Sequence, residues 1–121
     1  MSINSYKDLK VWQASIALTK EVYLVTQKFP KYEVYGLSSQ MQRAAVSIPS
    51  NIAEGHARDS TAEFLRFLTI ALGSLAELET QLIVAEKLIY IDDLILQSLL
   101  SKTDEIQRML RGLQKSLKAK L

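Results

Sequence analysis

The sequence contains no cysteine and a single histidine, His56, among its 121 residues. Without cysteine the chain forms no disulfide, offers no thiolate nucleophile and builds no cysteine-based zinc site, so a cytoplasmic location is expected. One histidine also excludes every multi-histidine metal site. Glu54 stands two residues from His56 on an expected helix, where the two side chains do not face each other as an acid and base. We therefore expect a non-enzymatic protein with no catalytic residue, metal or cofactor.

Aromatic residues, glycine and proline are also scarce. Aromatics make up 7% of the chain, with four glycines and two prolines, whereas 48% of the residues are hydrophobic. The apolar content is thus mainly aliphatic, which favours helix over sheet. The length predicts one domain over residues 1–121. The N-terminus lacks the apolar core of a secretory signal, and Lys and Glu interrupt the later apolar runs, so no membrane association is expected.

Apolar residues recur at helical spacing in four segments separated by short connections. We expect these helices to run from Asp8 to Phe29, from Leu37 to Gly55, from Ser60 or Thr61 to Ile89, and from Asp92 to Leu117. The third is apolar over so wide an arc that we expect it to be the central helix. Pro49 falls inside the second helix, where we expect a kink without a break. The pattern predicts an all-α antiparallel four-helix bundle.

A line of polar residues follows the second helix opposite its apolar stripe. This line is a candidate binding face or subunit contact, although a solvated helix face would carry the same residues without any partner. Its members are Gln40, Arg43, Ser47, Ser50 or Asn51, Glu54 and Arg58.

Gly73 interrupts the strongest helical pattern, at a cost of about 1 kcal/mol relative to alanine. Close approach by another helix, from this chain or a neighbouring subunit, would explain a glycine at that position. We therefore assign Gly73 to the candidate interface together with Gln40, Ser47, Asn51 and Glu54.

The net charge of +2 is small, but the charges are unevenly distributed. Residues 77–105 carry two basic and seven acidic side chains, and the last sixteen residues carry five basic and no acidic ones. Basic residues near a helix C-terminus compensate the helix dipole, and the same residues could contact phosphates. We name as candidate nucleic-acid contacts Arg108, Arg111, Lys115 and Lys118, with Arg43 and Arg58 as weaker members.

Four stretches of the sequence resemble those of a known family. They are LKVWQ (Leu9 to Gln13), FP followed by Glu33 and YGL (Tyr35 to Leu37), QxxRAAxSIPxNIAEG (Gln40 to Gly55) and EFxRFLxIAxGSLxELExQL (Glu63 to Leu82). Together they closely resemble the four-helix-bundle proteins of the bacterial 23S rRNA intervening-sequence family. The resemblance covers nearly the whole chain, and the last helix matches only in character.

The resemblance implies a ring-like homopentamer of antiparallel four-helix bundles. It also implies a connection with RNA, because many members are encoded within insertions in large ribosomal RNA genes. A related branch resembles the accessory protein of diversity-generating retroelements, which associates with a reverse transcriptase and nucleic acid. The expected function is therefore a non-enzymatic homo-oligomer that associates with RNA or other nucleic acid through repeated basic surfaces. The alternative is a protein-interaction scaffold or accessory subunit with no direct nucleic-acid role.

Overall fold

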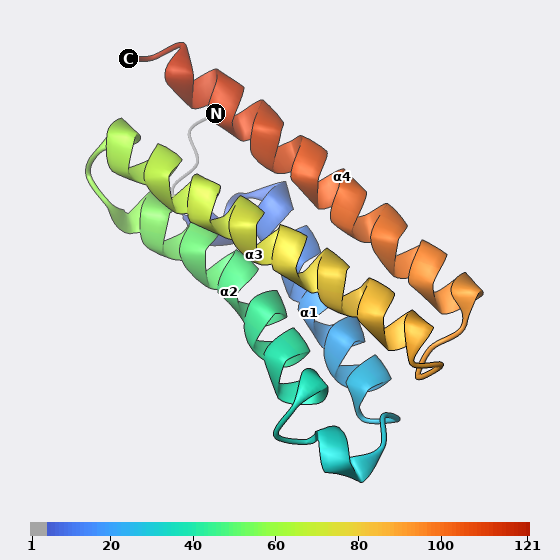
Figure 1. Cartoon of the computed structure of the whole chain (residues 1–121). Helices are drawn as coiled ribbons and strands as arrows, with labels where there is room; N and C mark the ends of the chain where they lie inside the picture. Colours follow the sequence, from blue (N-terminus) through green and yellow to red (C-terminus); the bar gives the residue numbers. More distant parts are fainter. Residues whose placement is uncertain (1–4) are drawn as a thin grey trace.

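The computed structural model describes residues 5–121 and contains four α-helices with no strand among those residues (Figure 1). This agrees with the predicted all-α class. Two short 3-10 turns, η1 and η2, precede the first and second helices. The elements are η1 (Tyr6–Asp8), α1 (Lys10–Thr26), η2 (Lys31–Glu33), α2 (Leu37–Ala57), α3 (Thr61–Lys87) and α4 (Asp93–Lys118).

The starts of α3 and α4 are fixed by side-chain caps. The Ser60 hydroxyl accepts a hydrogen bond from the backbone N–H of Glu63 at 3.2 Å, and the Asp92 carboxylate accepts one from Ile95 N–H at 2.8 Å. Such caps satisfy backbone donors that have no partner within the helix. Both helix starts agree with the sequence, but Asp8 lies in η1 and α1 begins two residues later, at Lys10.

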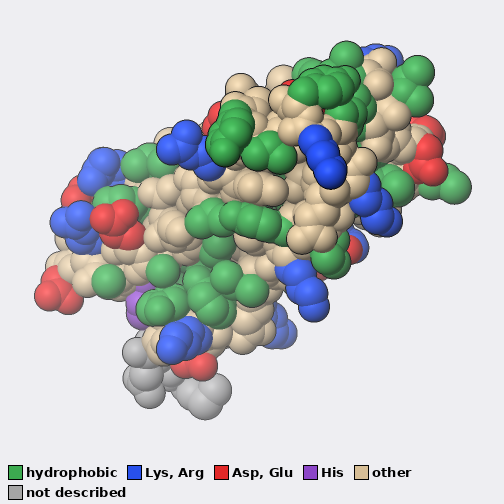
Figure 2. Space-filling view, turned by 90° about the horizontal axis from the view of Figure 1, so that it is seen from below, with side chains coloured by type: hydrophobic (Ala, Val, Ile, Leu, Met, Phe, Trp, Pro, Cys, Tyr) green, Lys and Arg blue, Asp and Glu red, His purple; other side chains and the backbone are tan. Residues whose placement is uncertain are grey.

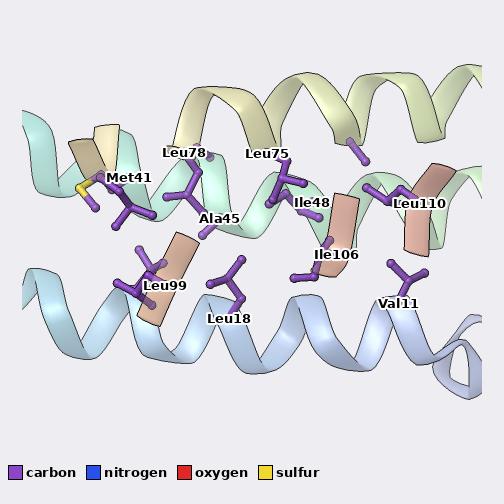
Figure 3. Close-up of a cluster of buried hydrophobic side chains, with 14 of the residues drawn as sticks. Val11, Leu18, Met41, Ala45, Ile48, Leu75, Leu78, Leu99, Ile106 and Leu110 are labelled. Carbon is purple, nitrogen blue, oxygen red and sulfur yellow. The ribbon is translucent and has the colours of Figure 1, made fainter. Parts of the chain in front are cut away.

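Each helix contributes one apolar stripe to a common core (Figure 3). Consecutive helices pack against each other, and α3 contacts both α2 and α4. Four leucines of α3 are exposed by 1% or less, which matches its predicted central position. The labelled core residues are Val11 and Leu18 of α1, Met41, Ala45 and Ile48 of α2, Leu75 and Leu78 of α3, and Leu99, Ile106 and Leu110 of α4.

The second helix is continuous through Pro49, as expected. Proline has no N–H, so the carbonyl of Ala45 loses its usual helical donor. The hydroxyl of Thr19 on α1 lies 3.2 Å from that carbonyl oxygen and also 2.8 Å from the carbonyl of Ser15. A side chain of the neighbouring helix therefore reaches the carbonyl that Pro49 leaves without its helical partner.

Glycine is required where α2 and α3 approach each other, and that place is Gly55. A β-carbon added at Gly55 would lie 2.6 Å from the Cβ of Phe67 and 3.0 Å from a ring carbon of Phe64. Gly73 is exposed, and a β-carbon there would meet no atom of residues 5–121 within 4 Å. The close approach expected at Gly73 therefore does not occur among residues 5–121, and contact with a neighbouring subunit stays a prediction.

One helix among residues 5–121, α3, is long and apolar enough to cross a membrane by length and composition alone. The ten residues between Arg66 and Glu77 carry no charge, and Glu77 and Glu79 interrupt the apolar pattern after them, so the expected lack of membrane association stays a prediction. In the bundle, only 39% of its most apolar window is buried. The helix thus keeps a largely uncharged surface directed away from α2 and α4.

Candidate nucleic-acid interface and subunit contacts

The C-terminal turns of α4, whose sequence is basic, lie at the same end of the bundle as the connection between α2 and α3 (Figure 1). A sequence separation of about fifty residues therefore does not keep these groups apart. We call this region the basic end, and it consists of Arg58, Arg66, Arg111, Lys115 and Lys118.

Two arginines of the basic end share one aromatic ring. The guanidinium carbons of Arg58 and Arg66 lie 5.1 and 4.6 Å from the ring centre of Phe67. Arg58 pairs with Glu54 at 3.6 Å, and Arg66 pairs with Glu63 at 3.0 Å. The hydrogen bond from Arg66 lowers the pKa of Glu63 and raises the pKa of Arg66. Exposed pairs of this kind are weak, so a phosphate can replace the carboxylate.

The remaining members of the basic end belong to α4. The side-chain amide of Gln114 donates a hydrogen bond to the Thr69 hydroxyl on α3 at 3.3 Å, and Arg111 donates to the Gln114 carbonyl oxygen at 3.4 Å. Thr69 stands one turn after Arg66, so this contact places the C-terminal turns of α4 against the first turns of α3. Within the described range 5–121, Lys115 and Lys118 form no ion pair.

Sequence reasoning placed Arg108 and Arg43 with this group. Arg108 is exposed beside it on α4 and pairs with Asp104 at 3.1 Å. Arg43 is exposed too, but it precedes Arg58 by fifteen residues of continuous helix, a distance of about 22 Å along α2. Arg66 was missed, because its spacing from Glu63 was typical of an exposed helical ion pair and the local sequence does not show which cations lie nearby.

Some residues of the polar line of α2 lie at the contact between α2 and α3, and others are exposed. The hydroxyls of Ser47 and Ser74 lie 2.8 Å apart, and the Asn51 amide donates to the Ser47 carbonyl at 2.7 Å and to its hydroxyl oxygen at 2.9 Å. Ser47 therefore connects α2 to α3 at the residue after Gly73, and Asn51 bonds to Ser47 within α2. Gln40 and Glu54 are exposed.

The opposite end of the bundle is held by aromatic and carboxylate groups. The Tyr90 hydroxyl donates to Glu33 Oε2 at 2.8 Å and lies 3.1 Å from the Tyr32 hydroxyl, and its ring packs on Phe29. These hydrogen bonds from Tyr32 and to Glu33 raise the pKa of Tyr90. We call this region the aromatic end: Phe29, Tyr32, Glu33, Ile89 and Tyr90.

Hydrophobic side chains are exposed around the aromatic end. Figure 2 shows them at the surface toward the right-hand side of the molecule, away from the histidine. Tyr35 is 97% exposed, Ile89 87% and Leu94 81%. Ile89 also adopts a backbone φ of 62°, in the left-handed region that a β-branched residue rarely occupies. No periodicity in the sequence indicated this end, because Tyr32 and Tyr90 are 58 residues apart.

Over the described part of the chain, no three His, Asp or Glu side chains gather where they could hold a metal ion. The ring of His56 packs edge-on against Phe64 with 5.7 Å between ring centres. The chemistry that the surface does support is charge pairing at the basic end and apolar contact elsewhere.

Comparison with known proteins assigns the family. The sequence profile of the 23S rRNA-intervening sequence proteins matches residues 7–112. The chain belongs to that family. The match confirms the resemblance of the four motifs, and it includes Arg58, Arg66 and Arg111, whereas Lys115 and Lys118 follow it.

A solved structure supports the fold of this 23S rRNA-intervening sequence protein. A crystal structure of a protein of unknown function, from the S23 ribosomal protein family of Bacteroides thetaiotaomicron VPI-5482, aligns with a TM-score of 0.81 and 25% sequence identity. The alignment covers 87% of this chain and 98% of that one. No curated protein matches the chain.

Proposed function

We propose that this protein is a non-enzymatic homo-oligomer that binds RNA through its basic end. The observation that carries the proposal is that Arg58 and Arg66 lie over the ring of Phe67 at the end of the bundle where the basic C-terminal turns of α4 also lie. Their carboxylate partners lie on the same helices and are exposed, so phosphates can take their place at little cost. Cationic surfaces without a base-reading element bind phosphate backbones with little sequence preference.

The proposed assembly is a ring-like homopentamer of antiparallel up-down bundles, each with its second helix bent at Pro49. A ring repeats the basic end in every subunit. Weak phosphate contacts then act together, because the first contact raises the effective concentration of the others. Binding of this kind weakens steeply with salt, as counterions are released from the RNA. The proposed location is the cytoplasm, where ribosomal RNA is found.

The test combines assembly and binding. Light scattering of nuclease-treated protein measures the mass of the assembly, and fluorescence polarisation measures affinity for a structured RNA at low and at moderate salt. We expect a pentamer that binds at low salt and loses affinity as salt rises. Protein that binds at neither salt concentration would contradict the RNA proposal.

The second candidate function is a protein-interaction scaffold, or an accessory subunit such as one for a reverse transcriptase. The exposed apolar side chains of the aromatic end favour it, because clustered exposed apolar groups mark interaction sites. This candidate places the partner on the aromatic end or along the polar line of α2. Charge reversal by Arg43→Glu is then expected to break a pull-down while RNA affinity is unchanged. An intact complex with that variant would count against the polar line.

A further inference from the structure

A hollow of about 290 Å³ lies inside the bend between α1 and α2, whose connection is drawn in cyan in Figure 1. The end of α1, the connection and the first turns of α2 enclose it, so its walls come from one continuous stretch of chain. Pockets for small molecules begin at about 300 Å³, and a hollow of this volume therefore has room for a small ligand only.

Two of the polar side chains that line the hollow are buried. Ser38 is 5% exposed, and its hydroxyl forms no hydrogen bond among residues 5–121. Thr26 is 4% exposed and accepts a hydrogen bond from the side-chain amide of Gln42 at 3.0 Å, which leaves that amide one further N–H. Buried polar groups normally have partners, so the Ser38 hydroxyl marks a position where a ligand can supply one.

Apolar side chains form much of the remaining wall. Phe29, Pro30 and Val34 line the hollow. The ring of Phe29 also packs on Tyr90, with 5.1 Å between ring centres, and this contact holds the ring in position. Apolar walls with a few converging polar groups are typical of pockets that bind small molecules. A ligand that fits this hollow therefore has an apolar body and one polar group.

The charge at the hollow is positive. Among the described residues that line it, Lys31 carries the only charge, and it forms no ion pair within residues 5–121. Glu33 does not line the hollow, and its carboxylate accepts hydrogen bonds from Leu37 N–H at 3.1 Å and from the Tyr90 hydroxyl at 2.8 Å. Ser38 lies in the first turn of α2, where the helix dipole also favours an anion. One lysine matches one negative charge, and a phosphate monoester carries close to two.

We propose that the hollow between α1 and α2 binds a small monocarboxylic acid with an apolar body. Its carboxylate accepts hydrogen bonds from the Lys31 ammonium and the Ser38 hydroxyl, and its body packs against Phe29 and Val34. The bound acid connects the end of α1 to the start of α2 and so stabilises the folded chain. The site lies at the end of the bundle opposite the basic end, and it does not depend on RNA binding.

The first test asks for the carboxylate and the apolar body. Titration calorimetry uses benzoate, phenylacetate and hexanoate as probes, each paired with its neutral amide. We expect at least one acid to saturate at one site per chain and to bind about 10-fold more tightly than its amide, because the amide offers no charge to Lys31. Failure of all three acids to saturate overturns the proposal, and so does equal affinity for acid and amide.

The second test locates the bound acid with two variants and a matched control for each. Lys31→Gln is expected to weaken the tightest acid by about 10-fold, whereas Lys28→Gln removes an exposed lysine outside the lining and is expected to change affinity by less than about 2-fold. Ser38→Ala is expected to weaken it by about 5-fold, and Ser39→Ala, also outside the lining, by less than about 2-fold.

The remaining outcomes separate this site from the proposed function. An acid that binds Lys31→Gln and Ser38→Ala as tightly as the wild type is bound elsewhere, which overturns the assignment to the hollow. The affinity of Lys31→Gln for RNA is expected to equal that of the wild type. Loss of RNA binding in Lys31→Gln would overturn the separation of this site from the RNA-binding surface.

Discussion

The basic end contains one connection between helices, and the aromatic end contains two. The two ends are stabilised by contacts of different range. At the basic end the arginines pair with carboxylates one helical turn away, as Arg66 does with Glu63. At the aromatic end, Tyr90 forms hydrogen bonds with Tyr32 and Glu33, which are more than fifty residues away in the sequence. Local pairs leave the cations exposed for exchange with another anion. Long-range hydrogen bonds instead fix one connection against the other and hold apolar side chains in the solvent.

The largest expected effect is on RNA affinity, which charge reversal at the basic end should lower and charge reversal at the aromatic end should not. The double variant Lys115→Glu/Lys118→Glu is expected to weaken RNA binding by about 100-fold at low salt, because attraction becomes repulsion in every subunit. The matched change at the other end, Lys28→Glu/Lys31→Glu, alters the net charge equally and is expected to change affinity by less than about 3-fold. Fluorescence polarisation at fixed ionic strength measures both. Equal losses would show that net charge, not the basic end, determines binding.

The next effect tests how closely the backbones pack near the basic end. Gly55→Ala is expected to lower the free energy of unfolding by about 1–3 kcal/mol, because the added methyl group overlaps the Cβ of Phe67. Gly112→Ala, at an exposed position of α4 with no neighbour from residues 5–121 within 4 Å, is expected to raise it by about 1 kcal/mol. Urea unfolding measures both changes. A stabilising Gly55→Ala would contradict the close contact.

A smaller effect is expected from the hydrogen bonds of the aromatic end. Tyr90→Phe keeps the ring on Phe29 but removes the hydroxyl that Glu33 accepts from, and we expect a loss of about 1–2 kcal/mol in unfolding free energy. Tyr35→Phe is the control, since its side chain is 97% exposed and no change is expected. Thermal unfolding at constant protein concentration measures the difference. If Tyr90→Phe and Tyr35→Phe were equally stable, the α1–α2 and α3–α4 connections would be held together by apolar contact alone.

The smallest effect concerns the strained turn of the aromatic end. Ile89→Gly is expected to stabilise the fold by about 1 kcal/mol, because glycine occupies the left-handed region without the steric cost that a β-branched residue incurs. Leu88→Gly, one residue earlier at a φ of −83°, is expected to destabilise instead. Chemical unfolding of the two variants measures whether each substitution raises or lowers the free energy of unfolding. A destabilising Ile89→Gly would show that its side chain contributes more contact than strain.

Much of the fold followed from local sequence. Apolar spacing predicted the four helices, because each helix needs one stripe directed to the core. The caps Ser60 and Asp92 were predicted because a cap bonds to a backbone group only three residues away. The family followed from the motifs between Leu9 and Leu82, and the profile match confirmed it.

The candidate site was predicted only where it is continuous along one helix. Arg111, Lys115 and Lys118 could be placed on one side of α4 from their spacing. That Arg66 belongs to the same end of the bundle could not, because spacing says nothing about which part of another helix lies at that end. The functions of Gly55 and Gly73 were likewise indistinguishable in the sequence, since both interrupt a helix and only the position of a neighbour separates them.

The sequence by itself therefore determined the helices, their caps, the family and the uneven charge of the last helix. Each of these depends on residues within a few positions of one another or on an ordered motif. Only the tertiary structure decided which helix ends lie at the same end of the bundle, where α2 and α3 approach closely, and that Tyr90 meets Tyr32 and Glu33. Those features depend on contacts between residues far apart in the chain, and the packing of whole helices places them together.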